Sequence, residues 1–244
     1  MNDLDIFKEY VNNYDLSDYN ISRKYYHSLR VRENSEKISK SLNLNDYDIN
    51  LAMFIGLTHD IGRFSQWKVY GTYDDNKSID HALLGVQLLL KKDSLVKFNI
   101  SVKDINIIRT AIYNHNKYKI EDNLDDRTLL FANIIRDADK LDLLYLLGKK
   151  DIILDEDDNE VTDVIHNDFW NCKEIDITKC CTLTDKVLFK MAFVFDLNFS
   201  KSFEIVDKEK LLDNFFETLK YKDKYKKYYL HAQNFIKGKI KKVA

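Results

Sequence analysis

Helical periodicity is the feature of this 244-residue chain that most restricts its fold. Apolar residues recur at the spacing of one helix face in six segments, near 4–13, 22–43, 46–61, 80–92, 102–118 and 127–148. The same period returns at about 184–197 and 207–238, whereas residues 149–185 mix acids with β-branched side chains and fit a loop, a short hairpin or a short helix near Val164–Trp170. The sequence predicts one all-α domain over residues 1–244, with an irregular insertion at about 149–185 and additional C-terminal helices at about 184–238.

The ends of these segments must be marked without proline, because the chain contains none. Glycine, asparagine, aspartate and serine then take over the turns and helix starts. Asp80 precedes "HALLGVQLLLKK" and is placed as a helix N-cap. Gly62 stands just past the 46–61 segment, where we expect a left-handed C-cap.

Composition excludes several classes of protein. A hydrophobic content of 45% with 32% charged residues is typical of a soluble globular chain. The net charge of -2 argues against a broad nucleic-acid-binding surface, and no apolar run is long enough to cross a membrane. Cys172, Cys180 and Cys181 provide no CxxC spacing and no disulfide framework, which favours a cytoplasmic location. The sequence leaves the oligomeric state open.

The stretch "GLTHDIGRF" places His59 and Asp60 at the end of an apolar run. A buried acid is costly unless it is paired or bound to a metal. Asp139 poses the same question, because it lies on an apolar stripe with Phe131, Ile135 and Leu146. Asp137, two residues earlier, is turned to the far side of that helix, where it faces solvent or a partner that supports the site.

Three further histidines are placed to face inward or to lie at a helix end. His115 continues the stripe of Ile108 and Ile112, and His27 lies one turn before Val31. His81 follows the cap at a helix start, where a positive charge is unfavourable but a neutral, metal-bound imidazole is not. Each histidine alone fits an ordinary core or surface residue. Together with the two acids, they fit a site for one or two metal ions between facing helices.

This order of residues resembles the HD-domain superfamily of metal-dependent phosphohydrolases. The segments "YHSLRVRENSEKIS", "FIGLTHDIGRF" and "IIRDADKLDLL" are similar to family segments in order and spacing, and the match covers about residues 22–148. Two more histidines, in "SIDHALLGVQLL" and "AIYNHNKY", resemble the subset that has a second metal position. The resemblance implies an all-α HD-domain helical bundle.

The resemblance also implies a ligand set. The first metal would be held by His27, His59, Asp60 and Asp139, and the second by His81 and His115, with Asp60 bridging the two. The expected cofactor is a divalent metal, as two ions drawn from Mn, Fe, Ni, Zn or Mg. Because the set is rich in imidazole, Mg²⁺ is disfavoured as the tightest-bound ion.

The expected activity is hydrolysis of a phosphate ester or anhydride in a nucleotide or another small phosphorylated substrate by a metal-activated water, as a phosphomonoesterase, pyrophosphohydrolase or phosphodiesterase. Asp60 is the expected catalytic residue. Arg63 and Lys140 are the candidate phosphate-binding groups, with salt bridges to neighbouring acids as their alternative role. Gln66 and Trp67 either line the pocket or belong to a packed connection. The alternative functions are a di-iron oxygenase on the same scaffold and a non-catalytic nucleotide-binding module.

Overall fold

The computed structural model describes residues 2–241 and contains helices and no strands in that range. The predicted all-α class is confirmed. The chain divides into two compact units, Met1–Asp139 and Lys140–Ala244, while a single domain over residues 1–244 stays a prediction. Among the described residues, no helix combines the length and the apolar character that crossing a membrane requires.

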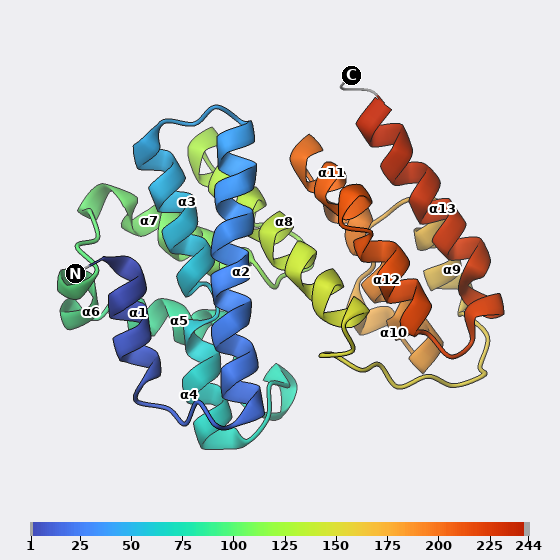
Figure 1. The fold of residues 1–244 in the computed structure, drawn as a ribbon, viewed down its shortest axis with the longest axis horizontal. Helices are drawn as coiled ribbons and strands as arrows, with labels where there is room; N and C mark the ends of the chain where they lie inside the picture. The colour runs from blue at the N-terminus through green and yellow to red at the C-terminus, as the bar shows by residue number, and fades with distance from the viewer. Residues whose placement is uncertain (1, 242–244) are drawn as a thin grey trace. The chain divides into compact units, whose positions relative to one another are not determined.

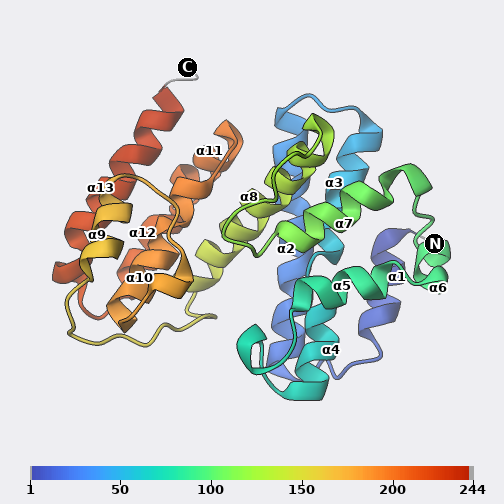
Figure 2. The same ribbon diagram turned by 180° about the vertical axis from the view of Figure 1, so that it is seen from behind.

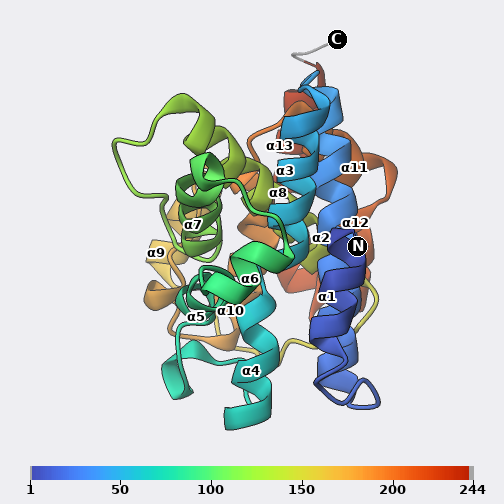
Figure 3. The same cartoon turned by 90° about the vertical axis from the view of Figure 1, so that its left-hand side faces the viewer.

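The first unit places its helices in two groups. The long α2 lies along α3, while α4 packs on α5, and α5 on α7 (Figures 1 and 2). Figure 3 shows α5 and α7 on one side of this unit and α2 and α3 on the other. The helices are α1 (Asp3–Val11), α2 (Tyr19–Ser41), α3 (Asp46–Thr58), α4 (Ile61–Tyr70), α5 (His81–Leu89), α6 (Lys92–Lys97), α7 (Ile105–Asn114) and the first part of α8 (Asp126–Gly148).

Asparagine and aspartate begin the helices of this unit, as the absence of proline predicts. Asn2 and Asp5 form a capping box at α1, and the side chains of Asp18 and Asn45 accept bonds from the first turns of α2 and α3. Asp80 accepts from the backbone nitrogens of the first turn of α5, so its predicted N-cap role is confirmed.

The prediction for Gly62 is wrong. The helix over 46–61 ends at Thr58, and Gly62 lies inside the following helix α4. The left-handed cap is Gly71, with φ of +63°, at the end of α4. Gly62 instead permits a close approach between helices, because a Cβ atom there would lie 2.3 Å from the carbonyl oxygen of His81 and 2.8 Å from the nitrogen of Gly85.

The second unit is made of the end of α8 and shorter helices. They are α9 (Asp163–Trp170), α10 (Leu183–Met191), α11 (Ser200–Lys208), α12 (Leu211–Thr218) and α13 (Lys222–Lys241). Helix α13 packs against α9, α10, α11 and α12. The segment predicted to be irregular contains α9, which agrees with the short-helix alternative. The segment at 207–238 is broken, because Lys210 has a left-handed backbone and Leu219 an extended one.

Candidate metal centre

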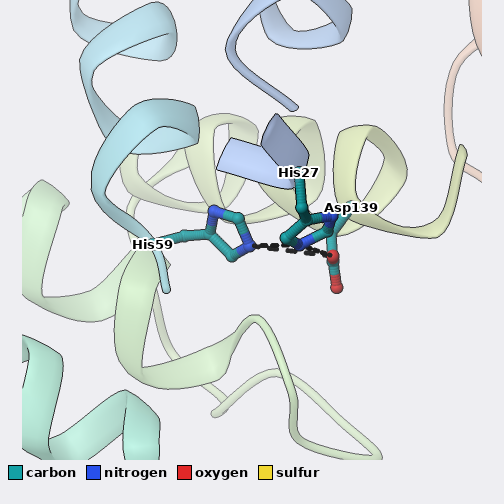
Figure 4. A group of neighbouring side chains, drawn as sticks. All are labelled: His27, His59 and Asp139. Carbon is teal, nitrogen blue, oxygen red and sulfur yellow. Dashed lines mark hydrogen bonds and ion pairs between the residues drawn. The ribbon is translucent and has the colours of Figure 1, made fainter. Parts of the chain in front are cut away.

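The first cluster of side chains joins α2, the end of α3 and α8. His27 Nε2 lies 3.2 Å from His59 Nε2 and 3.2 Å from Asp139 Oδ1, and His59 Nε2 lies 3.7 Å from the same oxygen. Both rings are buried. Figure 4 shows the two rings and the carboxylate converging from three separate segments. Three ligand atoms within 4.8 Å of one another are an arrangement that can hold a metal ion.

The second cluster joins the start of α5 to the end of α7. His81 is the first residue of α5 and His115 is the C-cap of α7. Their Nε2 atoms lie 3.1 Å apart, and both rings are buried. This explains why a histidine stands at the positive end of α5, since its ring is directed at the other imidazole.

Asp60 connects the two clusters. It lies in the turn between α3 and α4, and it is 2% exposed. Its Oδ2 atom is 3.4 Å from His27 Nε2 and 3.5 Å from His59 Nε2. Its Oδ1 atom is 3.3 Å from His81 Nε2 and 3.6 Å from His115 Nε2. Each oxygen of one carboxylate therefore faces its own pair of imidazole nitrogens.

The Nδ1 atoms of three of the histidines each lie within hydrogen-bonding distance of an oxygen acceptor. His59 Nδ1 lies 2.8 Å from the carbonyl oxygen of Gly56, and His115 Nδ1 lies 2.6 Å from that of Ile112. His81 Nδ1 lies 2.7 Å from Asp75 Oδ2. Carbonyl and carboxylate oxygens only accept, so each Nδ1 carries the proton. In the neutral rings, Nε2 then presents a bare lone pair to the interior of the site.

The positions of these lone pairs show whether the residues fit a metal ion. Between His81 and His115, two bare Nε2 atoms face each other without a proton to share, an arrangement that a cation between them would stabilise. Asp60 Oδ1 is also a buried oxygen without a hydrogen-bond partner among the described residues, and such an atom is costly to bury unless a cation satisfies it. The residues therefore fit a divalent metal with nitrogen and oxygen ligands.

The electrostatics keep these groups in the protonation states that bind metals. Burial lowers the pKa of His59, and burial lowers the pKa of His81 to about 4, so both rings are neutral at pH 7. Burial alone would raise the pKa of Asp60, but the Lys24 ammonium beside it outweighs burial and holds that pKa well below its usual range. Likewise, contacts with the rings of His27 and His59 outweigh the effect of burial on Asp139 and hold its pKa well below its usual range.

Two residues that support the site were missed in the sequence. Lys24 Nζ donates to Asp60 Oδ2 at 2.5 Å. Its position three residues before His27 on a helix was an available signal, because residues at that spacing share a face. Asp75, the partner of His81, begins a short 3-10 helix (Asp75–Lys77) in the connection between α4 and α5, where no periodicity marks it.

The four predicted substrate-binding residues have internal partners. Arg63 Nη1 donates to Asp75 Oδ1 at 2.9 Å, to Gln66 Oε1 at 2.8 Å and to the carbonyl oxygen of Tyr73 at 2.6 Å. Gln66 is fully buried, and its amide donates to Asp75, Ser78 and Ile79. These bonds favour the structural alternative for Arg63 and Gln66, whose roles toward a substrate stay predictions.

Trp67 and Lys140 also have internal partners. The indole nitrogen of Trp67 donates to Asp18 Oδ2 at 2.7 Å, and the ammonium of Lys140 pairs with Asp196.

Asp137 is fully buried, so the alternative that it faces solvent is wrong. The neighbouring Arg136 donates from α8 to the carbonyl oxygens of Asn114 and Lys117, which stand on either side of His115 in the chain.

Comparison with known proteins agrees with this site. A family model described as "HD domain" matches residues 25–144, a range that contains the five residues of the two clusters and Asp60 between them. No curated protein and no solved structure matched the chain. Through residues 25–144, the chain belongs to the HD-domain superfamily, whose members are mostly metal-dependent phosphohydrolases.

Proposed function

We propose that this chain is a phosphohydrolase that cleaves a phosphate ester or anhydride of a nucleotide or another small phosphorylated substrate with the help of two divalent ions. The observation that carries the proposal is the position of Asp60, whose two oxygens face separate pairs of imidazole nitrogens. The first ion would be held by His27, His59, Asp60 and Asp139. The second would be held by His81, His115 and Asp60.

The chain's own residues then have distinct tasks. Asp60 would serve both positions, and the neutral rings of His59 and His81 offer lone pairs without first losing a proton. The Asp75 carboxylate and the backbone carbonyls fix the ring orientations. When bound, a pair of divalent ions lowers the pKa of a water molecule and neutralises charge on phosphoryl oxygens.

The six ligand positions also fit a di-iron oxygenase, so the experiment must separate the two reactions. Metal-free protein would be loaded with Mn²⁺, Ni²⁺ or Mg²⁺ and incubated with nucleoside mono-, di- and triphosphates, cyclic nucleotides and generic phosphate esters. Release of phosphate, pyrophosphate or nucleotide is expected, strongest with Mn²⁺ or Ni²⁺, and absent in His59→Ala and Asp60→Ala. The matched control is His166→Ala, which removes a histidine in the second unit.

Each alternative has its own signature. Oxygen consumption and an iron EPR signal in anaerobically prepared protein, without phosphate release, would favour the oxygenase. Absence of both bound metal and a metal-induced thermal shift would favour a non-catalytic module. The cytoplasmic setting is part of the proposal and is supported by the three cysteines, which are all free thiols.

A further inference from the structure

The side-chain ammonium of Lys24 is paired with the carboxylate of Asp60, the residue that connects the two clusters. Its Nζ donates to Asp60 Oδ2 at 2.5 Å, and its side chain is only 14% exposed. The same oxygen lies 3.4 Å from His27 Nε2 and 3.5 Å from His59 Nε2. The ammonium thus holds the oxygen that would complete the first metal position, and it shares that oxygen with two of the proposed ligands.

An ammonium and a divalent ion cannot both remain at this oxygen at low cost. Their repulsion acts over a few ångströms inside a buried site, where solvent screens poorly. Lysine can move, because its charge lies at the end of a flexible four-carbon stem. The ring of Tyr73, whose centroid lies 5.6 Å from Nζ, offers a surface over which the ammonium can rest.

Lys24 also differs from the other cations near the motif acids. Arg63 Nε lies 3.6 Å from Asp60 Oδ1, but the Arg63 guanidinium is also bound to Asp75 and to a backbone carbonyl. Lys140 is paired with Asp196. The charged partner of Lys24 is Asp60 itself. If a metal ion binds Asp60, Lys24 loses this ion pair. Its ammonium then lies beside the site and can bind another anion.

We infer that Lys24 is a resident counter-ion of Asp60 that a divalent metal displaces, and that the displaced ammonium then binds the phosphoryl group of the substrate. The inference rests on the proposed function for its second step only. Lys24 would accordingly weaken metal binding by competition and strengthen anion binding once the metal is in place.

Calorimetric titration with Mn²⁺ tests the first step without any turnover. Lys24→Met keeps the unbranched shape and helix propensity of the side chain but removes its charge. We expect the variant to bind Mn²⁺ about tenfold more tightly than the unaltered protein. Its metal-free form should melt about 5–10 °C lower, because Asp60 loses its buried partner, and excess Mn²⁺ should abolish that difference.

Inorganic phosphate tests the second step with Mn²⁺-saturated protein. We expect phosphate to bind Lys24→Met about tenfold more weakly, while Lys24→Arg restores binding. The control is Lys40→Met on the same helix, which removes an equal charge from a lysine that is 61% exposed and paired with Glu36; it should change neither affinity. Circular dichroism verifies that each variant is folded.

Each result decides one step. Unchanged or weaker Mn²⁺ binding in Lys24→Met would overturn the inference, because a lysine that only orients Asp60 would help the metal. Tighter Mn²⁺ binding with unchanged phosphate affinity would overturn the second step. Neither result depends on hydrolysis, so a failure of the proposed reaction remains distinguishable.

Discussion

Asp75 Oδ2 accepts a hydrogen bond from His81 Nδ1 at 2.7 Å, and its other oxygen accepts from Arg63 and Gln66. One carboxylate therefore ties the irregular segment before α5 to helix α4 and fixes the orientation of a proposed metal ligand. Hydrogen bonds of this kind set which nitrogen of a ligating histidine faces the metal. The paired groups also lower the pKa of Asp75 against the opposing effect of burial.

Asp75→Asn should weaken metal binding at the His81–His115 position. The amide keeps the size of the side chain but loses the charge that holds the Nδ1 proton, so affinity for the more weakly bound ion should fall about 10- to 100-fold. Calorimetric titration with Mn²⁺ measures this. The exposed Asp122→Asn is the matched control for charge. Equal Mn²⁺ isotherms for the two variants would show that Asp75 does not position His81.

Gly62→Ala should destabilise the first unit and disturb the position of His81. The added Cβ would meet two backbone atoms of α5, at 2.3 Å and 2.8 Å, neither of which can rotate away. We expect a loss of about 3 kcal/mol in the free energy of unfolding. Urea denaturation measures it.

Gly238→Ala is the opposite case and the control for Gly62→Ala. A Cβ at Gly238, inside α13, would have no atom within 4 Å. Replacing this helical glycine should stabilise the protein by about 0.5–1 kcal/mol. If the two alanines had similar effects, the close packing of α4 on α5 would not be what requires glycine at position 62.

The sequence was sufficient to predict the helix start at Asp80 and the ligand motif, but not the contacts that form between distant segments. The helix start at Asp80 follows from local chemistry, and the histidines and acids of the site stand in an ordered motif, so both were recognisable along the chain. Gly62 was misplaced because its requirement comes from α5, which begins nineteen residues later in the chain. Asp75 was missed because the folding of an irregular segment, rather than any period, brings it to His81. Lys24 was on the expected helix face, but spacing does not reveal which acid it meets.

Asp60→Asn and Asp139→Asn should differ in the number of ions that they lose. Asp60 faces both pairs of histidines, whereas Asp139 faces the pair His27 and His59. Starting from about two ions per chain, Asp139→Asn should retain about one and Asp60→Asn less than one. Elemental analysis after gel filtration in Mn²⁺ measures both. Equal metal contents in the two variants would contradict a carboxylate shared between two positions.

Asp185→Ala should destabilise the second unit. This fully buried carboxylate accepts hydrogen bonds from Thr162 N, Thr162 Oγ1, Cys181 N and Thr182 N. It therefore connects the segment at residues 149–185 to the start of α10. Leaving these donors unpaired should lower the free energy of unfolding by about 3 kcal/mol. Urea denaturation provides the measurement, with the exposed Asp207→Ala as control. Equal stabilities would mean that water replaces the carboxylate at no cost.

Alkylation of Cys180 should be slow and should keep accelerating at high pH. Burial, together with the nearby Asp185 carboxylate, raises the pKa of the Cys180 thiol to about 11. Because the thiolate is the reactive form, a raised pKa leaves less of it at any given pH below 11. In Cys172→Ser/Cys181→Ser, which retains only Cys180, the rate of reaction with iodoacetamide should still rise between pH 9 and 10.5.

The same variant unfolded in urea provides the reference for Cys180, because an unfolded thiol has a pKa of about 8.5 and its rate should level off above roughly pH 9.5. Far-UV circular dichroism at each pH verifies that the untreated variant remains folded. A plateau at the same pH with and without urea would show that neither burial nor Asp185 acts on this thiol. Because the Asp185 carboxylate contributes to the raised pKa of Cys180, Asp185→Ala in the same background should move the pH–rate profile of the folded protein toward that of the unfolded protein.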